Sequence, residues 1–177
     1  MYDRWGPNLM ILPYPNWNTP LPDSGAIFDA SARYRYRLWR SWNPARPGIT
    51  FVMLNPSVAD AKCNDPTIRR CLGFAQSWGF GSLEVVNLFA LCTSDPVLLK
   101  ESPDPIGPEN DFYLQSAVEK GPVLAAWGCH GGMGQRDEMV LGMLPVRRLW
   151  CLGITKRGHP RHPLYVAAAT RPVPLRY

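Results

Sequence analysis

Short apolar runs alternate along the chain with segments of helical periodicity. The first clear run, Phe51–Leu54, is typical of a strand that is buried on both faces of a sheet. Asp65 and Pro66 then supply an N-cap followed by a proline at the first helical position, and apolar residues recur at helical spacing until Gly79. The pattern therefore predicts a strand, a loop and a helix in this order.

The same alternation continues through the second half of the chain. Helices are predicted from about Pro108 and over about Glu138–Leu144. Three further strands are predicted over Leu83–Phe89, Val123–Gly128 and Arg148–Gly153. Strands that alternate with helices favour a parallel sheet that is covered by helices on both faces.

Two segments show neither the apolar runs of strands nor the spacing of helices. Residues 1–32 are rich in proline, asparagine and aromatic residues, so we expect an irregular arm there, ahead of a single domain over residues 33–177. The segment from Thr93 to Gly107 contains two Asp-Pro pairs and is predicted to be a loop.

Basic and aromatic side chains alternate over Arg33–Trp42. Period two places the arginines on one face of a strand and the aromatic residues on the other. Such an edge strand can contact nucleic-acid phosphates, or its charges can prevent aggregation between sheets. The second interpretation is favoured.

The composition is that of a folded protein with a modest positive charge. Of the 177 residues, 46% are hydrophobic, and 19 Lys and Arg outnumber 14 Asp and Glu, which gives a net charge of +5. This balance is compatible with a phosphate backbone as partner. We expect a cytoplasmic protein without a membrane partner, because no apolar run reaches the length of a membrane span and no signal peptide is evident.

The cysteines do not form a ligand pattern. The chain has five, with no C-x-x-C pair, and none lies near a histidine at ligand spacing. We therefore expect no metal and no other cofactor, and thiols that are reduced and mostly buried.

Unusual polar residues follow each of the predicted strands. Asn55 follows the first, Asn87 lies near the end of the second, the loop after Trp127 follows the third, and His159 and His162 follow the fourth. Because the carboxyl ends of parallel strands meet at the same rim of a sheet, where ligands of α/β proteins bind, we expect these residues to converge.

In this order and spacing, the strand-end motifs resemble those of the uracil-DNA glycosylase superfamily, and the pattern is also similar to a bacterial and phage family of unknown function. The resemblance implies a three-layer α/β/α fold with a central, mostly parallel sheet of four to five strands. It extends over residues 48–168 and is carried by Leu54-Asn55-Pro56-Ser57, Val85-Val86-Asn87, Ala126-Trp127-Gly128 and His159-Pro160-Arg161-His162-Pro163-Leu164.

The resemblance assigns roles to individual residues. Asn55 matches the residue that orients the attacking water, as in the mismatch-specific branch, and Asn87 matches the residue that binds the polar edge of the flipped base. His159 or His162 faces the carbonyl oxygen of the leaving base, and His159 is favoured. The remaining matches are Pro56, Ser57, Phe89 and Trp127 around the base, Arg161 at the phosphates, and Leu164 as the wedge in the duplex.

The chemistry of base removal is consistent with these residue types. Hydrolysis of an N-glycosidic bond needs a placed water molecule and stabilisation of the negative charge on the departing base. The base must first leave the stack and enter a pocket. No lysine lies in the motifs to form a Schiff base, so we expect base release without strand cleavage.

Ser57 stands where the uracil-specific branch has a tyrosine that blocks the C5 position of the pyrimidine. The smaller side chain favours a C5-modified base, such as a phage hypermodified pyrimidine, and hence a role in anti-phage defence. Two alternatives stay open: a DNA-binding module of the same fold without catalysis, and a hydrolase of free modified nucleotides. No obligate protein partner is inferred.

Overall fold

The structure is a computed structural model that describes residues 23–144 and 149–176. A seven-stranded sheet forms its centre, with the strand order β1-β2-β4-β3-β5-β6-β7. The strands are β1 (Asp23–Phe28), β2 (Arg35–Ser41), β3 (Gly48–Met53), β4 (Ser82–Asn87), β5 (Val123–Ala125), β6 (Leu149–Cys151) and β7 (Val173–Pro174). The helices are α1 (Pro66–Ser77), α2 (Pro96–Glu101), α3 (Asn110–Val118) and α4 (Arg136–Leu141), with single 3-10 turns η1 (Gly128–His130), η2 (Met133–Gln135) and η4 (Pro163–Tyr165).

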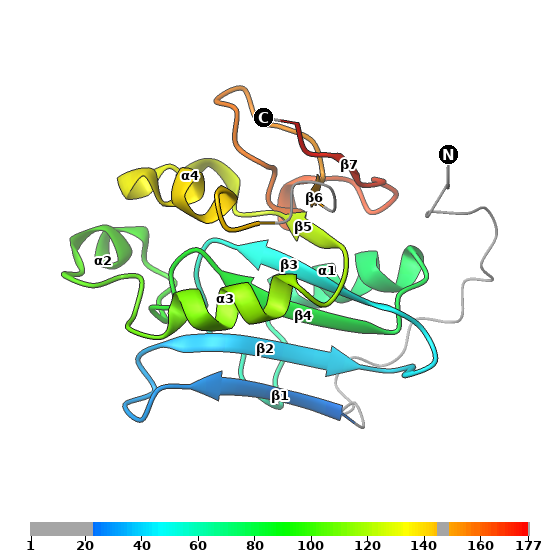
Figure 1. Ribbon diagram of the computed structural model, residues 1–177, viewed down its shortest axis with the longest axis horizontal. Helices are drawn as coiled ribbons and strands as arrows, with labels where there is room; N and C mark the ends of the chain where they lie inside the picture. The colour runs from blue at the N-terminus through cyan, green and yellow to red at the C-terminus, as the bar shows by residue number, and fades with distance from the viewer. Residues whose placement is uncertain (1–22, 145–148, 177) are drawn as a thin grey trace.

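The sheet is mixed and larger than the sequence predicted. Its centre, β4-β3-β5-β6, is parallel, whereas β1, β2 and β7 join antiparallel at the two sides (Figure 1). The α/β class is confirmed. The expected four to five strands were too few because β1 lies in the segment predicted as an irregular arm and β7 has only two residues. Residues 1–22 of that arm lie outside the described residues.

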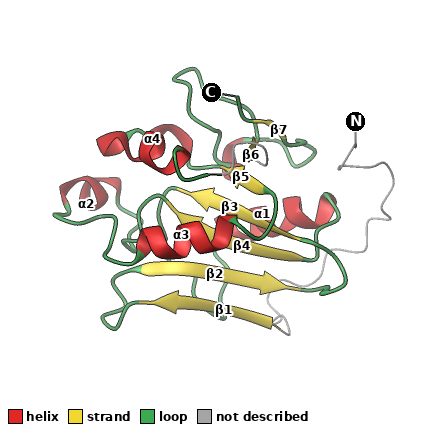
Figure 2. Ribbon diagram, viewed as in Figure 1, coloured by secondary structure: helices red, strands yellow, loops and turns green. Residues whose placement is uncertain are grey.

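Helices pack against both faces of the sheet, as Figure 2 shows for α1 and α3. On β3, Phe51 belongs to the core cluster that contains the buried residues of α1, and its neighbour Val52 belongs to the cluster that contains those of α3. Val85 and Val86 divide in the same way on β4. Adjacent side chains of a strand point to opposite faces, so a continuous apolar run is what a strand between two cores requires.

Helix α1 follows the sequence prediction closely. The Asp65 side chain accepts a hydrogen bond from the backbone N–H of Ile68 at 2.8 Å, and Pro66 begins the helix. Leu72 and Phe74 are buried against the sheet. Gly79 then takes a φ of +84°, a conformation that glycine adopts without steric cost, and the chain turns toward β4.

Strand β2 is not an edge strand, which corrects the sequence prediction. It lies between β1 and β4, and a register shift in β1 opposite Arg35 and Arg37 interrupts the expected alternation. Arg35 and Arg40 are only 2% exposed. Arg40 is satisfied by neighbouring acceptors, including the Asn64 side chain at 2.9 Å and the Asp60 carbonyl at 2.6 Å.

Helix α3 buries fewer of its apolar residues than predicted. Leu114 and Val118 are in the core, but Phe112 is 67% exposed. Residues two apart on a helix point about 200° away from each other, so Phe112 cannot share the buried face of Leu114.

The five cysteines are free, but the prediction that most are buried was wrong. Cys71 and Cys151 are buried, Cys92 is half-buried, and Cys63, in a loop, and Cys129, in η1, are exposed. Within residues 23–144 and 149–176, no helix has the length and apolar character that crossing a membrane requires.

Candidate functional site

A cleft of about 1170 Å³ opens at the carboxyl ends of β3, β4 and β5. Its lining comes from the ends of these strands, from the start of α1, from α2, and from the loops that follow β5 and β6. Four residues that the sequence placed at one rim all line it: Asn55, Asn87, Trp127 and His162. Their convergence follows from the parallel centre of the sheet.

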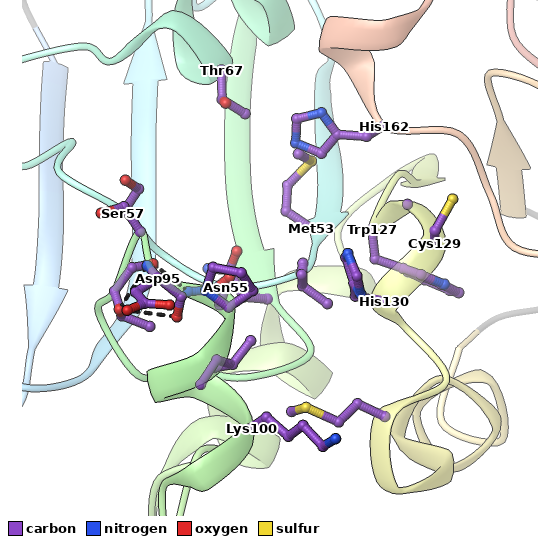
Figure 3. Close-up of a pocket in the computed structure, with 18 of the residues that line it drawn as sticks. Met53, Asn55, Ser57, Thr67, Asp95, Lys100, Trp127, Cys129, His130 and His162 are labelled. Carbon is purple, nitrogen blue, oxygen red and sulfur yellow. Dashed lines mark hydrogen bonds between the residues drawn. The ribbon is translucent and has the colours of Figure 1, made fainter.

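Asn55 is held in one orientation by its amide nitrogen. This atom donates to the backbone carbonyls of Thr93 at 2.7 Å, Pro56 at 3.0 Å and Leu91 at 3.3 Å. The amide oxygen is therefore the end of the side chain that is left for the cleft. Figure 3 shows Asn55 on one side of the cleft and His162 on the other.

Asn87 is the least satisfied polar group of the site. Its side chain is at the end of β4 and only 1% exposed, and neither its amide nitrogen nor its amide oxygen has a hydrogen-bond partner among the described residues. A buried amide without partners costs free energy, about 1–3 kcal/mol by mutational data. Because Asn87 lines the cleft, a ligand with a donor and an acceptor would satisfy both ends of the amide.

Asn110, at the start of α3, holds the turn after β4 in place. Its amide nitrogen donates to the carbonyls of Asn87 and Leu88, each at 3.0 Å, and Arg136 also donates to the Leu88 carbonyl at 2.9 Å. No sequence signal indicates this role, because Asn110 is predicted only as part of the start of a helix.

We expect Asn110→Ala to lower the free energy of unfolding by about 1–3 kcal/mol, because two buried carbonyls would lose a donor. Chemical denaturation monitored by tryptophan fluorescence measures this change. An unchanged unfolding midpoint would show that the turn after β4 does not depend on Asn110.

Two glycines allow close contacts beside the cleft. A Cβ on Gly131 would lie 2.0 Å from a ring carbon of Trp127, so only glycine permits this loop to cover the indole. Gly128 has a φ of +77° and donates to the Pro160 carbonyl at 2.9 Å, which joins the end of β5 to the final loop. Trp127 is 1% exposed, and its indole N–H has no partner in the described part of the chain.

The two candidate histidines occupy different places. His162 lines the cleft, and its Nδ1 accepts from the backbone N–H of Leu164 at 3.3 Å, so the neutral ring carries its proton on Nε2. His159 is outside the described lining, with its Nδ1 3.0 Å from Asp137 of α4. The sequence favoured His159, but the geometry favours His162.

Burial lowers the pKa of His162 below its ordinary value of 6.5, and the Asp65 carboxylate opposes part of this change. The unfolded chain therefore takes up this proton at a higher pH than the folded protein. Stability from the neutral ring is present above pH 6.5 and declines as the pH falls toward the lowered pKa.

We expect His162→Gln to lose less stability than the wild type on acidification from about pH 7.5 to 5.5, because glutamine has no such proton to take up. Thermal unfolding of both proteins across this range measures the difference. Parallel loss of stability in the two proteins would contradict the buried, neutral state of His162.

The other predicted site residues divide between the cleft and its surroundings. Ser57 and Arg161 line the cleft. Pro56 is buried beside it without lining it, and Leu164 is 43% exposed on η4 outside the lining. Phe89 does not line the cleft, which corrects its predicted placement beside the base: its side chain is 2% exposed and points into the α3 side of the core.

Several lining residues were missed or given no role by the sequence. From the sequence, Arg35 is predicted only as part of a charged strand, and His130 has no assigned role, yet both line the cleft. Asp65 was assigned to the helix N-terminus, which is correct, but it also faces the cleft. Lys100 comes from α2, a segment without a chemical motif, and Lys156 from the loop after β6, three residues ahead of the motif that starts at His159. The available signals were proximity in sequence to Asn55 for Asp65 and to His159 for Lys156.

Residues 35–164 match the model of a family described as "Protein of unknown function (DUF1643)". The chain belongs to this family. The predicted similarity to a family of unknown function is thereby confirmed. No curated protein and no solved structure matches the chain. In this DUF1643 chain, the matched region includes β2 to β6 and every lining residue of the cleft except Tyr165.

Proposed function

We propose that the protein is a monofunctional DNA glycosylase that hydrolyses the bond between deoxyribose and a flipped, C5-modified pyrimidine, and leaves an abasic site. The observation that carries this proposal is the buried amide of Asn87, which has no hydrogen-bond partner among the described residues, in the cleft that also contains Asn55 and His162. A pyrimidine edge presents the neighbouring donors and acceptors that such an amide can bind.

The resemblance to the uracil-DNA glycosylase superfamily supports the same conclusion. A sheet with helical cores on both faces is compatible with the three-layer α/β/α arrangement of that superfamily. In both, the chemistry would lie at the carboxyl ends of the parallel strands.

Asn55 and His162 would act at the two ends of the bond that breaks. The fixed amide oxygen of Asn55 would orient a water molecule for attack on the anomeric carbon. The Nε2–H of His162 would donate to the oxygen of the departing base as negative charge develops there. The electron pair of the glycosidic bond leaves with the base, water supplies the hydroxyl group on the sugar, and the remaining proton of the water ends on the released base.

The cleft has room for a base that carries a large substituent. Its volume of about 1170 Å³ exceeds the roughly 300–1,000 Å³ of ordinary small-molecule sites. Ser57 leaves the side of the predicted C5 position open. Such bases occur in phage DNA, so the biological role would be defence against phages.

Exposed basic and apolar side chains beside the cleft would hold the DNA. Arg161, Lys156 and Lys100 can contact phosphates from two sides of the opening. Leu164 and Tyr165, 43% and 80% exposed on η4, would fill the space that the flipped base leaves in the duplex.

The test is incubation with phage DNA that carries modified pyrimidines, beside unmodified and uracil-containing DNA, followed by detection of abasic sites and of free base. We expect abasic sites in the modified DNA without strand breaks. Release of base from mononucleotides but not from DNA would identify a nucleotide hydrolase instead. Salt-dependent DNA binding without release from any substrate would identify a binding module.

A further inference from the structure

Arg35 is a buried cation of the cleft that has no ion-pair partner within residues 23–144 and 149–176. Its side chain starts from β2 and is 2% exposed, yet it lines the cleft. No carboxylate oxygen of the described residues lies within 4.0 Å of its guanidinium, although Asp65 and Asp60 are near enough to act on it electrostatically. Nη1 donates to the Ala59 carbonyl, and Nε has no partner in the described chain.

The other buried arginines are better satisfied than Arg35, although Arg40 also has no ion-pair partner among the described residues. Arg40, equally buried on the same strand, donates from all three nitrogens of its guanidinium to side-chain and backbone acceptors. Arg136 leaves its Nη1 without a partner in the described chain, as Arg35 does its Nε, but its charge is paired with Asp111. An unpaired buried charge is costly, and here burial also lowers the pKa of Arg35. A bound anion would remove most of this cost.

The position of Arg35 indicates which part of a ligand it would meet. Its acceptor, Ala59, is two residues from Ser57, so the guanidinium lies on the side of the cleft that carries Ser57. This is the side at which the proposed function places the C5 substituent of the flipped pyrimidine.

We propose that Arg35 forms a subsite for a negatively charged group on the C5 substituent of the base. This proposal rests on the proposed function and narrows its substrate class to pyrimidines with an acidic substituent, because the guanidinium has only donors to offer. Basic substituents, such as an amine, would be rejected by charge repulsion.

The experiment measures binding, so that it does not depend on catalysis. Oligonucleotides carry one 2′-fluoro nucleotide, which resists hydrolysis, with a 5-carboxy-, 5-hydroxymethyl- or 5-aminomethyluracil base. The full chain is compared with Arg35→Met, which removes the charge at similar length, with Arg35→Lys, which keeps it, and with Lys100→Met, which removes an exposed cation of the same cleft. Thermal unfolding checks that each variant folds.

We expect the wild type to bind the carboxylate about 10- to 100-fold more tightly than the amine, the ratio that one charged hydrogen bond provides. Arg35→Met should reduce this ratio to less than about threefold, and Lys100→Met should leave it within about twofold, since an exposed charge is screened. If Arg35→Met does not fold, the ratio in Arg35→Lys decides: a reduced ratio supports the proposal, because lysine cannot make the bidentate contact of a guanidinium with a carboxylate, and an unchanged ratio overturns it. A wild type without the preference, or a folded Arg35→Met that keeps it, overturns the proposal.

A second arm separates the two sources of an anion. Thymidine 5′-monophosphate, without an acidic base, is titrated against the wild type and Arg35→Met. Binding that depends on Arg35, together with no preference among the three oligonucleotides, would assign the subsite to a nucleotide phosphate and refute the C5 assignment. Base release is assayed separately on cleavable substrates. Preference for the carboxylate without release refutes the glycosylase alone, and release without preference refutes the subsite alone.

Discussion

Asn55→Ala is expected to reduce the rate of base release by at least about 100-fold, because the attacking water would lose the group that orients it. DNA affinity should change little, since Asn55 contacts no phosphate in the proposed complex. Single-turnover assays of abasic-site formation, together with binding measurements on uncleavable DNA, separate the two effects.

The environment of Asn55 also predicts how its closest isostere behaves. The amide nitrogen donates to three backbone carbonyls, so Asn55→Asp would place a carboxylate against three acceptors. We therefore expect Asn55→Asp to be less stable than Asn55→Ala, although aspartate has nearly the same shape as asparagine. Thr67→Ala, at the opposite side of the cleft and without an assigned role, is the control for general disturbance of the cleft. Full activity in a folded Asn55→Ala would remove the asparagine from the mechanism.

Asn87→Ala is expected to weaken binding of the target base about 10- to 100-fold while changing the free energy of unfolding by less than about 1 kcal/mol. The buried amide has no partners in the described chain, so its removal takes away a cost of burial along with the packing of its atoms. Affinity for a 2′-fluoro substrate and chemical denaturation give the two quantities.

Asn110→Ala is the matched comparison for Asn87→Ala. The two asparagines are equally buried and adjacent, but Asn110 is bonded to backbone carbonyls and Asn87 is not. Asn110→Ala should lower the free energy of unfolding, and Asn87→Ala should weaken binding of the target base. A large loss of stability in Asn87→Ala without a change in base binding would show that its amide serves the fold rather than a ligand.

The sequence by itself determined the local elements and the edge of the sheet at which the site lies. Apolar runs identified β3, β4, β5 and β6, and the cap at Asp65 identified the start of α1. The apolar runs and the cap could be recognised because each depends on residues that are near neighbours in the chain. Once the strands are taken as parallel, their carboxyl ends share one rim, which places Asn55, Asn87 and Trp127 together.

Only the tertiary structure decided which polar groups are satisfied and which are left for a ligand. Arg35 and Arg40 both belong to the same basic and aromatic segment of the sequence. Arg40 donates to acceptors in the loop of residues 60–64, whereas Arg35 lines the cleft. His159 meets Asp137 of α4, whereas His162 faces the cleft. Each outcome depends on a contact between segments more than ten residues apart, and the residue type alone does not carry that information. The chain determines where a site can form, and the packing of distant segments determines which side chains are free to act there.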